Sequence, residues 1–337
     1  MKTQPPAPIR TVYYTDERTD EFSSAEIEPR RIDESYRYID PRPGWKAARF
    51  IAYRLFAMPA AFLYCKLALH ARFENRQVLR KAGKTGCFVY GNHTQQVGDP
   101  FLPNLALFPK SVYMIVHPNN VSMPVLGKIT PYLGALPLPS NIKAMRSFLD
   151  AIRTRIEEGS FIMVYPEAHI WPYYTGIRDF PATSMKYPVE LDVPSFTLTT
   201  TYHRRRFGRK PRTVTYLDGP FYPDHSLPPR ARAQALRDEI YKTMVRRSQE
   251  SDYEYIRYVK KEEKTWPISC IAATTRCSTA CWRRACPLCA GWTRQGRWPS
   301  TFSPWSWPGF PPIIFPWPGT MRTSSRRRCA ATTQTPT

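Results

Sequence analysis

Residues 87–100 read CFVYGNHTQQVGDP. The opening run is apolar and aromatic, includes a β-branched residue, and predicts a buried strand that ends at Gly91 and Asn92. His93 and Asp99 follow the strand closely. A histidine with a nearby carboxylate at a strand end is a common way to build a general base and its orienting partner. The same residues would also be found if Asn92 caps a turn and His93 is an ordinary surface histidine. Other parts of the chain must distinguish this interpretation from a catalytic pair.

Strands and helices alternate through the body of the chain, and Gly159 is placed to end one helix. This alternation predicts an α/β fold with a mostly parallel central sheet flanked by helices. Ligand sites in such sheets lie beyond the carboxyl ends of strands, so His93 and Glu167, which both follow strands directly, are expected on one rim. The predicted strands are 87–90, 111–116, 161–165, 196–202 and 213–217, and the predicted helices are 101–107, 142–158 and 229–250.

An apolar segment at residues 45–73 predicts a helix with a kink at Pro59. Its charge-free part, residues 55–65, is shorter than the roughly 20 apolar residues that a spanning helix needs. Arginines and lysines flank its aromatic residues, which favours a helix that lies in the membrane interface with its charged side chains reaching lipid phosphates. A helix buried in the core of the fold is the alternative.

The chain has 337 residues and a formal net charge of +22. This length allows a substantial core, and the charge indicates an anionic partner: a membrane surface, a nucleic acid or a phosphorylated substrate. The leader, residues 1–44, is polar and lacks the apolar run of a secretory signal, so a cytoplasmic protein is expected.

The last part of the chain, residues 264–337, has a different composition. It contains no Asp or Glu, ten of the basic residues, six of the eight cysteines and seven of the nine tryptophans, which leaves +12 for residues 1–263. The abrupt change is typical of translation in a shifted reading frame, and a disordered or membrane-adhering extension is a second interpretation. A metal module is a third, because Cys286 and Cys289 have a metal-ligand spacing. This tail is predicted to lie outside the fold.

Four short blocks follow one another along the body: Asn92-His93 with Asp99-Pro100, then residues 133–137, then residues 165–170, then Val193-Pro194. In this order they resemble the blocks of the glycerolipid acyltransferase superfamily, typified by lysophosphatidic acid acyltransferases. The resemblance covers about residues 45–260 and includes the apolar segment, which corresponds to the family's membrane-docking helix. It implies an acyltransferase domain over residues 45–263, with residues 45–73 as the docking helix.

The sequence departs from the family pattern at three places. Five residues separate His93 from Asp99 where the family has four, and Gly98 is expected to allow a loop that restores their approach. The Gly-Thr-Arg that follows the family's glutamate is Ala168-His169-Ile170 here, so Arg178, Lys186 or His169 is expected to replace the phosphate-binding arginine. The arginine of the second block is also missing, and Lys143 and Arg146 are the nearby candidates.

The resemblance implies acyl transfer from a thioester, acyl-CoA or acyl-carrier protein, to the hydroxyl of a lysophosphatidic acid-like glycerolipid. His93 would be the general base and Asp99 would hold its imidazole. The enzyme would sit at the cytoplasmic face of the membrane, peripheral or monotopic, with no metal, no cofactor and no nucleic acid partner. The residues implied in substrate binding are Asn92, Glu167, His169, Arg178, Lys143 and Arg146.

A basic non-catalytic protein that binds a membrane surface or nucleic acid is the rival interpretation, since the charge fits it equally well. Two other classes lack their signatures, because the sequence contains neither the Gly-x-Ser-x-Gly of a serine hydrolase nor a Gly-x4-Gly-Lys phosphate loop.

Overall fold

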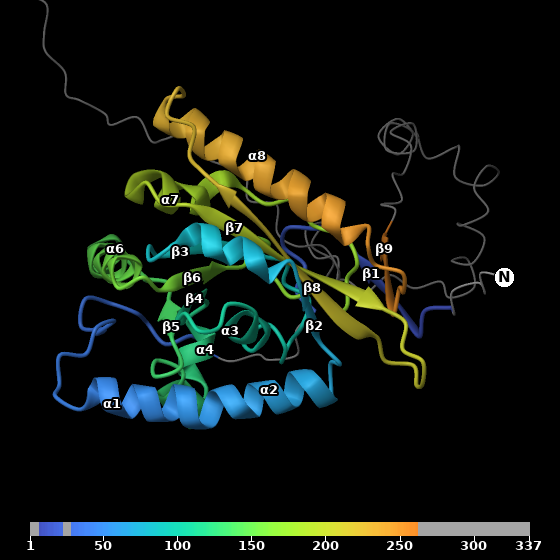
Figure 1. Cartoon of the computed structure of the whole chain (residues 1–337), viewed down its shortest axis with the longest axis horizontal. Helices are drawn as coiled ribbons and strands as arrows, with labels where there is room; N and C mark the ends of the chain where they lie inside the picture. Colours follow the sequence, from blue (N-terminus) through green and yellow to red (C-terminus); the bar gives the residue numbers. More distant parts are fainter. Residues whose placement is uncertain (1–6, 23–27, 262–337) are drawn as a thin grey trace, which may run out of the picture. The chain divides into compact units, whose positions relative to one another are not determined.

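The computed structural model describes residues 7–22 and 28–261, and these residues build a seven-stranded sheet with helices on both faces (Figure 1). All neighbouring strands are parallel except β7 and β8, so β2 and β8 run against the other five. The predicted α/β fold with a mostly parallel sheet is confirmed. In sheet order the strands are β2 (Arg72–Glu74), β8 (Arg212–Phe221), β7 (Ser195–His203), β3 (Cys87–Gly91), β6 (Phe161–Val164), β4 (Val112–Val116) and β5 (Ala135–Pro137).

The helices include those predicted at residues 101–107, 142–158 and 229–250, together with several short ones that were not predicted. They are α1 (Trp45–Phe50), the π-helix η1 (Ile51–Ala57), α2 (Met58–Leu67), the 3-10 helix η2 (Arg76–Ala82), α3 (Leu102–Ala106), α4 (Asn119–Ser122), α5 (Leu126–Ile129), α6 (Ile142–Glu157), the 3-10 helix η3 (Ala182–Met185), α7 (Lys186–Leu191) and α8 (Pro229–Ser248).

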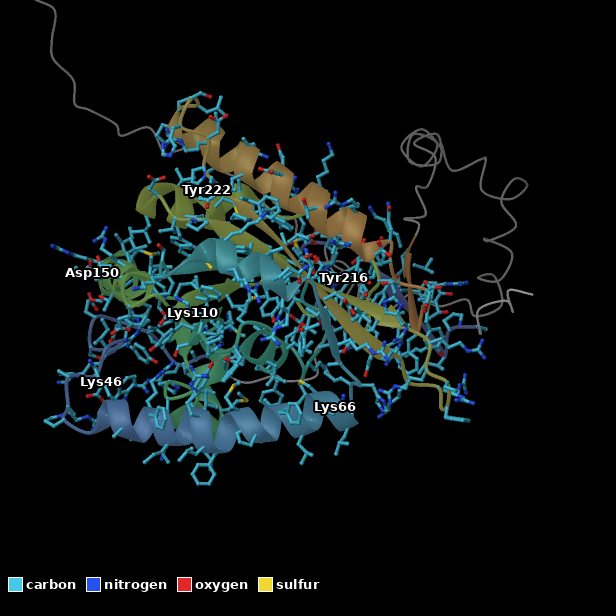
Figure 2. All side chains as sticks on the ribbon, viewed as in Figure 1. Lys46, Lys66, Lys110, Asp150, Tyr216 and Tyr222 are labelled. Atoms are coloured by element: carbon cyan, nitrogen blue, oxygen red, sulfur yellow. The ribbon has the colours of Figure 1, made fainter. Side chains whose placement is uncertain are left out.

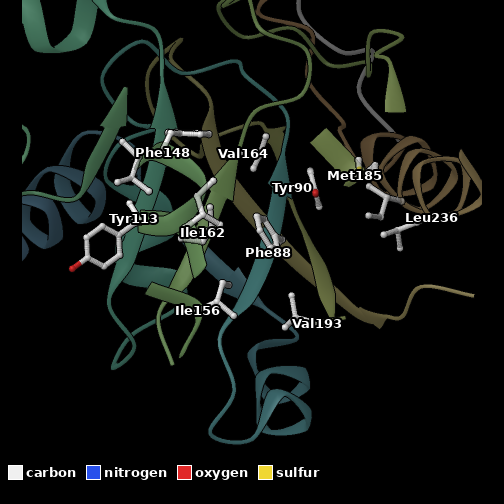
Figure 3. Close-up of a cluster of buried hydrophobic side chains, with 14 of the residues drawn as sticks. Phe88, Tyr90, Tyr113, Phe148, Ile156, Ile162, Val164, Met185, Val193 and Leu236 are labelled. Atoms are coloured by element: carbon white, nitrogen blue, oxygen red, sulfur yellow. The ribbon is translucent and has the colours of Figure 1, made fainter. Parts of the chain in front are cut away.

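Strand β3 lies in the middle of the sheet and is buried at all five positions. Phe88 and Tyr90 face the larger core cluster, together with Phe148 from α6 and Leu236 from α8 (Figure 3). Val89, on the opposite face, belongs to a second cluster with residues of α3. A strand covered on both faces has no solvent side, which is why its sequence is continuously apolar rather than alternating.

Helix α6 begins and ends as its sequence predicts. The Asn141 side chain accepts a hydrogen bond from the Ala144 N–H at 2.8 Å and so caps the first turn. Gly159 follows the helix with φ +73°, a left-handed conformation that ends helices and that glycine adopts without strain. The chain then enters β6, and Glu167 lies three residues after the carboxyl end of that strand.

The apolar segment forms the continuous helical run Trp45–Leu67, shorter than predicted because β2 begins at Arg72 (Figure 1). Pro59 has no N–H to donate, and the backbone just before it widens into η1. In length and composition the run could cross a membrane, a property that core helices of soluble proteins share. Lys46 and Lys66 lie near its two ends (Figure 2).

One side of this helical run packs on the domain along its length. Near its start, the Tyr53 hydroxyl bonds to Asn104. Near its end, the Tyr64 ring meets Phe101 at 5.7 Å and Cys65 is buried with Leu102. The opposite side exposes large apolar side chains: Phe50, Ile51, Leu55, Phe56, Phe62, Leu63 and Leu67.

The packing of Cys65 gives a test of this arrangement. Burial raises the pKa of its thiol to about 12, whereas an accessible cysteine titrates near 8.5. Because only the thiolate reacts, we expect alkylation of Cys65 at pH 8 to be at least about 1000-fold slower in the native protein than after denaturation. Peptide mapping of iodoacetamide-treated protein measures this for Cys65 individually. Rapid native labelling of Cys65 would show that α2 does not stay packed on the domain.

The leader contributes a strand that the sequence did not predict. Strand β1 (Arg10–Tyr14) pairs in parallel with β9 (Ile256–Lys260), with Arg10 opposite Ile256. Together they form a separate two-stranded sheet. Tyr14 then packs against Trp171 with ring centroids 4.7 Å apart. The leader thus reaches the loop that follows β6.

All the described residues belong to one compact unit that lies within residues 1–263. The interpretations offered for residues 264–337, including the metal module, fall outside the described residues. They stay predictions, as do the proposed domain limits.

Candidate active site

His93 and Asp99 form a hydrogen-bonded pair at the carboxyl end of β3. His93 Nδ1 lies 2.7 Å from Asp99 Oδ2, and the two side chains are 19% and 3% exposed. Asp99 Oδ2 also accepts a hydrogen bond from the Gln95 N–H at 2.9 Å. A carboxylate that accepts from Nδ1–H leaves the lone pair on Nε2, and Nε2 has no partner among the described residues. This imidazole can accept a proton.

The segment between the pair absorbs the extra residue by forming a turn. The Asp99 N–H donates to the Gln95 carbonyl at 3.0 Å, which folds Asp99 back toward His93. Gly98 lies in this turn against Leu69, and a Cβ at Gly98 would come within 2.9 Å of Leu69 Cδ1. A larger residue at this position would therefore require the Leu69 side chain, just after α2, to shift. The expected approach of Asp99 to His93 is confirmed as geometry.

Tyr165 supports the pair from the end of β6. Its ring stacks on the His93 imidazole with centroids 4.5 Å apart and an angle of 14° between planes. Its hydroxyl donates to the Asp99 carbonyl at 2.7 Å. Burial raises the pKa of Tyr165 well above its usual value, so the hydroxyl keeps its proton and stays a donor. Sequence reasoning did not single out Tyr165, although its place directly before Pro166-Glu167 was a usable signal.

The carboxylate of Asp99 is enclosed by protein. Burial raises its pKa, while the hydrogen bonds from His93 and from the Gln95 N–H act in the opposite direction. A second buried network lies behind it, where Tyr202 bonds Thr94 at 2.7 Å and accepts from Gln95 at 3.0 Å. These contacts fix the chain immediately after His93.

Asn92 is buried and spans two strands. Its side chain donates to the Thr200 carbonyl at 2.9 Å and accepts from the Thr200 N–H at 2.8 Å. Both polar groups are thus bonded to β7 at the point where β3 ends. This contact holds the strand end that presents His93, and a direct role of Asn92 in substrate binding stays a prediction.

Glu167 and Arg178 form a buried ion pair next to His93. Glu167 accepts hydrogen bonds from the His93 N–H at 3.3 Å and from the Arg178 N–H at 3.1 Å, and its carboxylate lies 3.1 Å from the Arg178 guanidinium. The guanidinium also lies over the Trp171 ring at 4.8 Å. Burial raises the pKa of Glu167 and the Arg178 charge opposes that shift. Both side chains are almost fully buried, so Arg178 is occupied by Glu167 rather than open to a substrate phosphate.

The leader covers the loop that follows Glu167. His169 bonds the Glu21 carboxylate at 2.9 Å, and Trp171 Nε1 donates to the Asp20 carbonyl at 2.8 Å. Ala168, where the family has glycine, has φ +64°, which costs an alanine roughly 1 kcal/mol. His169 therefore stands at the rim, paired with a carboxylate of the chain itself.

The remaining predicted residues are separate from this cluster. Lys143 and Arg146 are exposed in the first turns of α6, which follows β5 at the edge of the sheet. Neither side chain forms a hydrogen bond or ion pair with His93, Asp99 or Glu167 among the described residues. Within residues 7–22 and 28–261, no group of three or more His, Cys, Asp or Glu could hold a metal ion.

Comparison with known proteins identifies the class to which this site belongs. Residues 70–200 match the model of the Acyltransferase family. Residues 70–200 therefore form an acyltransferase domain, in agreement with the resemblance to the glycerolipid acyltransferases. The match covers His93, Asp99, Tyr165 and the Glu167–Arg178 pair.

The structure is also similar to a crystal structure, that of the 1-acyl-sn-glycerophosphate acyltransferase PlsC from Thermotoga maritima. The two chains are 16% identical with a TM-score of 0.42, and the likeness covers 59% of this chain and 80% of that one. A likeness at this level does not carry over what that protein acts on. No curated protein matches the sequence.

Proposed function

We propose that this protein transfers an acyl group from a thioester, acyl-CoA or acyl-carrier protein, to the hydroxyl of a lysophosphatidic acid-like glycerolipid. The observation that carries the proposal is the His93–Asp99 pair, 2.7 Å apart at the end of β3, within a domain of the Acyltransferase family. An imidazole whose Nδ1–H is held by a carboxylate is a general base at Nε2.

The reaction follows from that geometry. The acceptor hydroxyl attacks the thioester carbonyl carbon while Nε2 of His93 takes its proton. The new C–O bond forms, the C–S bond breaks, and the leaving thiolate takes the proton back from the imidazolium. Asp99 stabilises the imidazolium between the two proton transfers, and Tyr165 and Gln95 hold Asp99 in place. No covalent acyl-enzyme is required because the acceptor is the nucleophile.

The apolar helical run supports a site of action at a membrane surface. One side of it packs on the domain at both ends, so a helix crossing the bilayer would carry the domain's own surface into lipid. A helix lying in the interface buries only its exposed apolar side. Leu69, just after α2, touches Gly98 beside Asp99, which brings the end of this helix next to the active site. An acceptor lipid can then reach His93 from the bilayer.

An activity panel tests the proposal. Purified protein is incubated with acyl-CoA or acyl-carrier protein and, in turn, with lysophosphatidic acid, other lysophospholipids and monoacylglycerol. We expect thiol release that depends on the acceptor, and an equal amount of ester product with lysophosphatidic acid. Thiol release that is the same with and without acceptor would indicate hydrolysis, and absence of release with every pair would remove the proposal.

A further inference from the structure

The turn between β7 and β8 is unusually basic. Residues 204–210 read RRRFGRK and contain five cations and no acid, and we call this segment the basic hairpin. Gly208, at φ +82°, allows the tight reversal. Phe207 is 78% exposed beside it. A lone exposed apolar side chain needs no explanation, but here it stands among cations at the tip of a hairpin.

Four of the five cationic side chains of the basic hairpin make no hydrogen bond or ion pair within the described part of the protein. Among residues 7–22 and 28–261, Arg204, Arg206, Arg209 and Lys210 form no ion pair. Arg206 lies over the Phe207 ring at 5.4 Å, so the aromatic group and a cation project together. The hairpin thus concentrates positive charge around an apolar tip. The Asp252 carboxylate at its root accepts from the Arg204 N–H at 2.9 Å and lies beside His203, and it pairs with none of the hairpin's cationic side chains.

The root of the basic hairpin is fixed to the end of α2. Arg205, the one arginine used internally, donates to the Ala68 carbonyl and, at 3.0 Å, to the Pro211 carbonyl. The Thr213 N–H donates to the Leu69 carbonyl at 3.0 Å. Leu67, on the exposed apolar side of the helical run, lies only one residue from Ala68. The hairpin therefore continues the apolar side of the helix, next to the chain that contacts Gly98.

We propose that the basic hairpin is a second membrane contact that selects bilayers containing anionic lipids. Its arginines and lysine pair with lipid phosphate and carboxylate groups, and the Phe207 ring enters the interface. This inference deepens the proposed function by naming the lipid surface at which the site works. It separates two roles: the helix supplies apolar contact with any bilayer, and the hairpin supplies the preference for negative charge.

Vesicle binding by the full-length protein tests this inference. The hairpin variant carries Arg204→Gln, Arg206→Gln and Arg209→Gln, and leaves Arg205 intact. The control variant carries Arg230→Gln, Lys242→Gln and Arg246→Gln, which removes the same charge from exposed positions of α8. Each basic residue at a surface contributes about fivefold to partitioning into anionic membranes, so three together contribute on the order of 100-fold. Both variants keep residues 264–337, so any binding by that segment cancels.

We expect the hairpin variant to partition on the order of 100-fold more weakly than wild type into phosphatidylcholine vesicles containing 30% phosphatidylglycerol. The control variant should change less than tenfold, and vesicles of phosphatidylcholine alone should not distinguish the three proteins. A Phe207→Ser variant should bind both vesicle types several-fold more weakly. An equal loss of vesicle binding in the hairpin and control variants would overturn the inference. So would a hairpin variant that binds anionic vesicles like wild type and loses only its binding to single-stranded nucleic acid.

Two controls keep this result separate from other failures. An unchanged melting temperature shows that the hairpin variant is folded. Turnover with the acceptor diluted in micelles of a neutral detergent, which offer little anionic surface, should match wild type. Absence of turnover in all the proteins would contradict the proposed function and leave the vesicle comparison unaffected.

Discussion

His93→Ala is expected to abolish measurable acyl transfer while the protein stays folded. General-base assistance is worth roughly 10²–10⁴-fold, and among the described residues no other imidazole is hydrogen-bonded to Asp99. The side chain is partly exposed, so its removal leaves only a small cavity. Turnover of lysophosphatidic acid and the melting temperature are the two measurements.

His225 offers a matched control. It also lies beside an aspartate, with His225 Nε2 3.0 Å from Asp192, but both side chains are more than 60% exposed and belong to no site. His225→Ala should keep wild-type turnover. A folded His93→Ala protein with near wild-type activity would end the general-base proposal, whatever the control shows.

Arg178→Met is expected to give the largest loss of stability. It leaves the Glu167 carboxylate buried without its counter-charge, which costs about 3–5 kcal/mol. For a domain of this size that lowers the melting temperature by roughly 10 °C. The double variant Glu167→Gln/Arg178→Met removes both charges and should recover part of the loss. Urea unfolding of the three proteins measures the free energies and their coupling.

The exposed pair Arg257 and Glu254 provides the comparison. Its nitrogen and oxygen lie 2.8 Å apart, but the side chains are 52% and 39% exposed, and such pairs contribute less than about 1 kcal/mol. Arg257→Met should therefore change stability little. If Arg178→Met were equally mild, or if the double variant were no more stable than the single one, the Glu167–Arg178 pair would not have the structural role that its burial indicates.

The parts of the fold that were predictable are those determined by local pattern. The apolar runs of β3 and β6 and the amphipathic α6 were found because burial on two faces, or on one helical face, is visible in neighbouring residues. The order of acyltransferase blocks located His93 and Asp99. Their approach was expected from Gly98, but the form of the turn could not be predicted, because it depends on the Gln95 carbonyl and on the packing of Gly98 against Leu69.

The parts that escaped prediction depend on partners distant in sequence. Strands β1 and β9 are short and partly charged, and each is stable only beside the other. Arg178 was identified as a candidate phosphate ligand, but its buried contact with Glu167 could not be read from the letters. The leader carboxylate beside His169 comes from a segment 148 positions away. Composition shows that charges exist, and only the fold shows which of them are already paired.

The pairing of β1 with β9 fixes an order of events during synthesis. Arg10 leaves the ribosome early, but its partner Ile256 is added last among the elements of the domain. At about 5–20 residues per second the first strand waits on the order of 10–50 s for the second. The seven-stranded sheet can assemble in that interval. The leader cannot yet pair with β9, so it is not yet fixed over the loop after Glu167. The nascent domain is therefore expected to form its sheet first, and to cover the rim that carries Glu167 and His169 last.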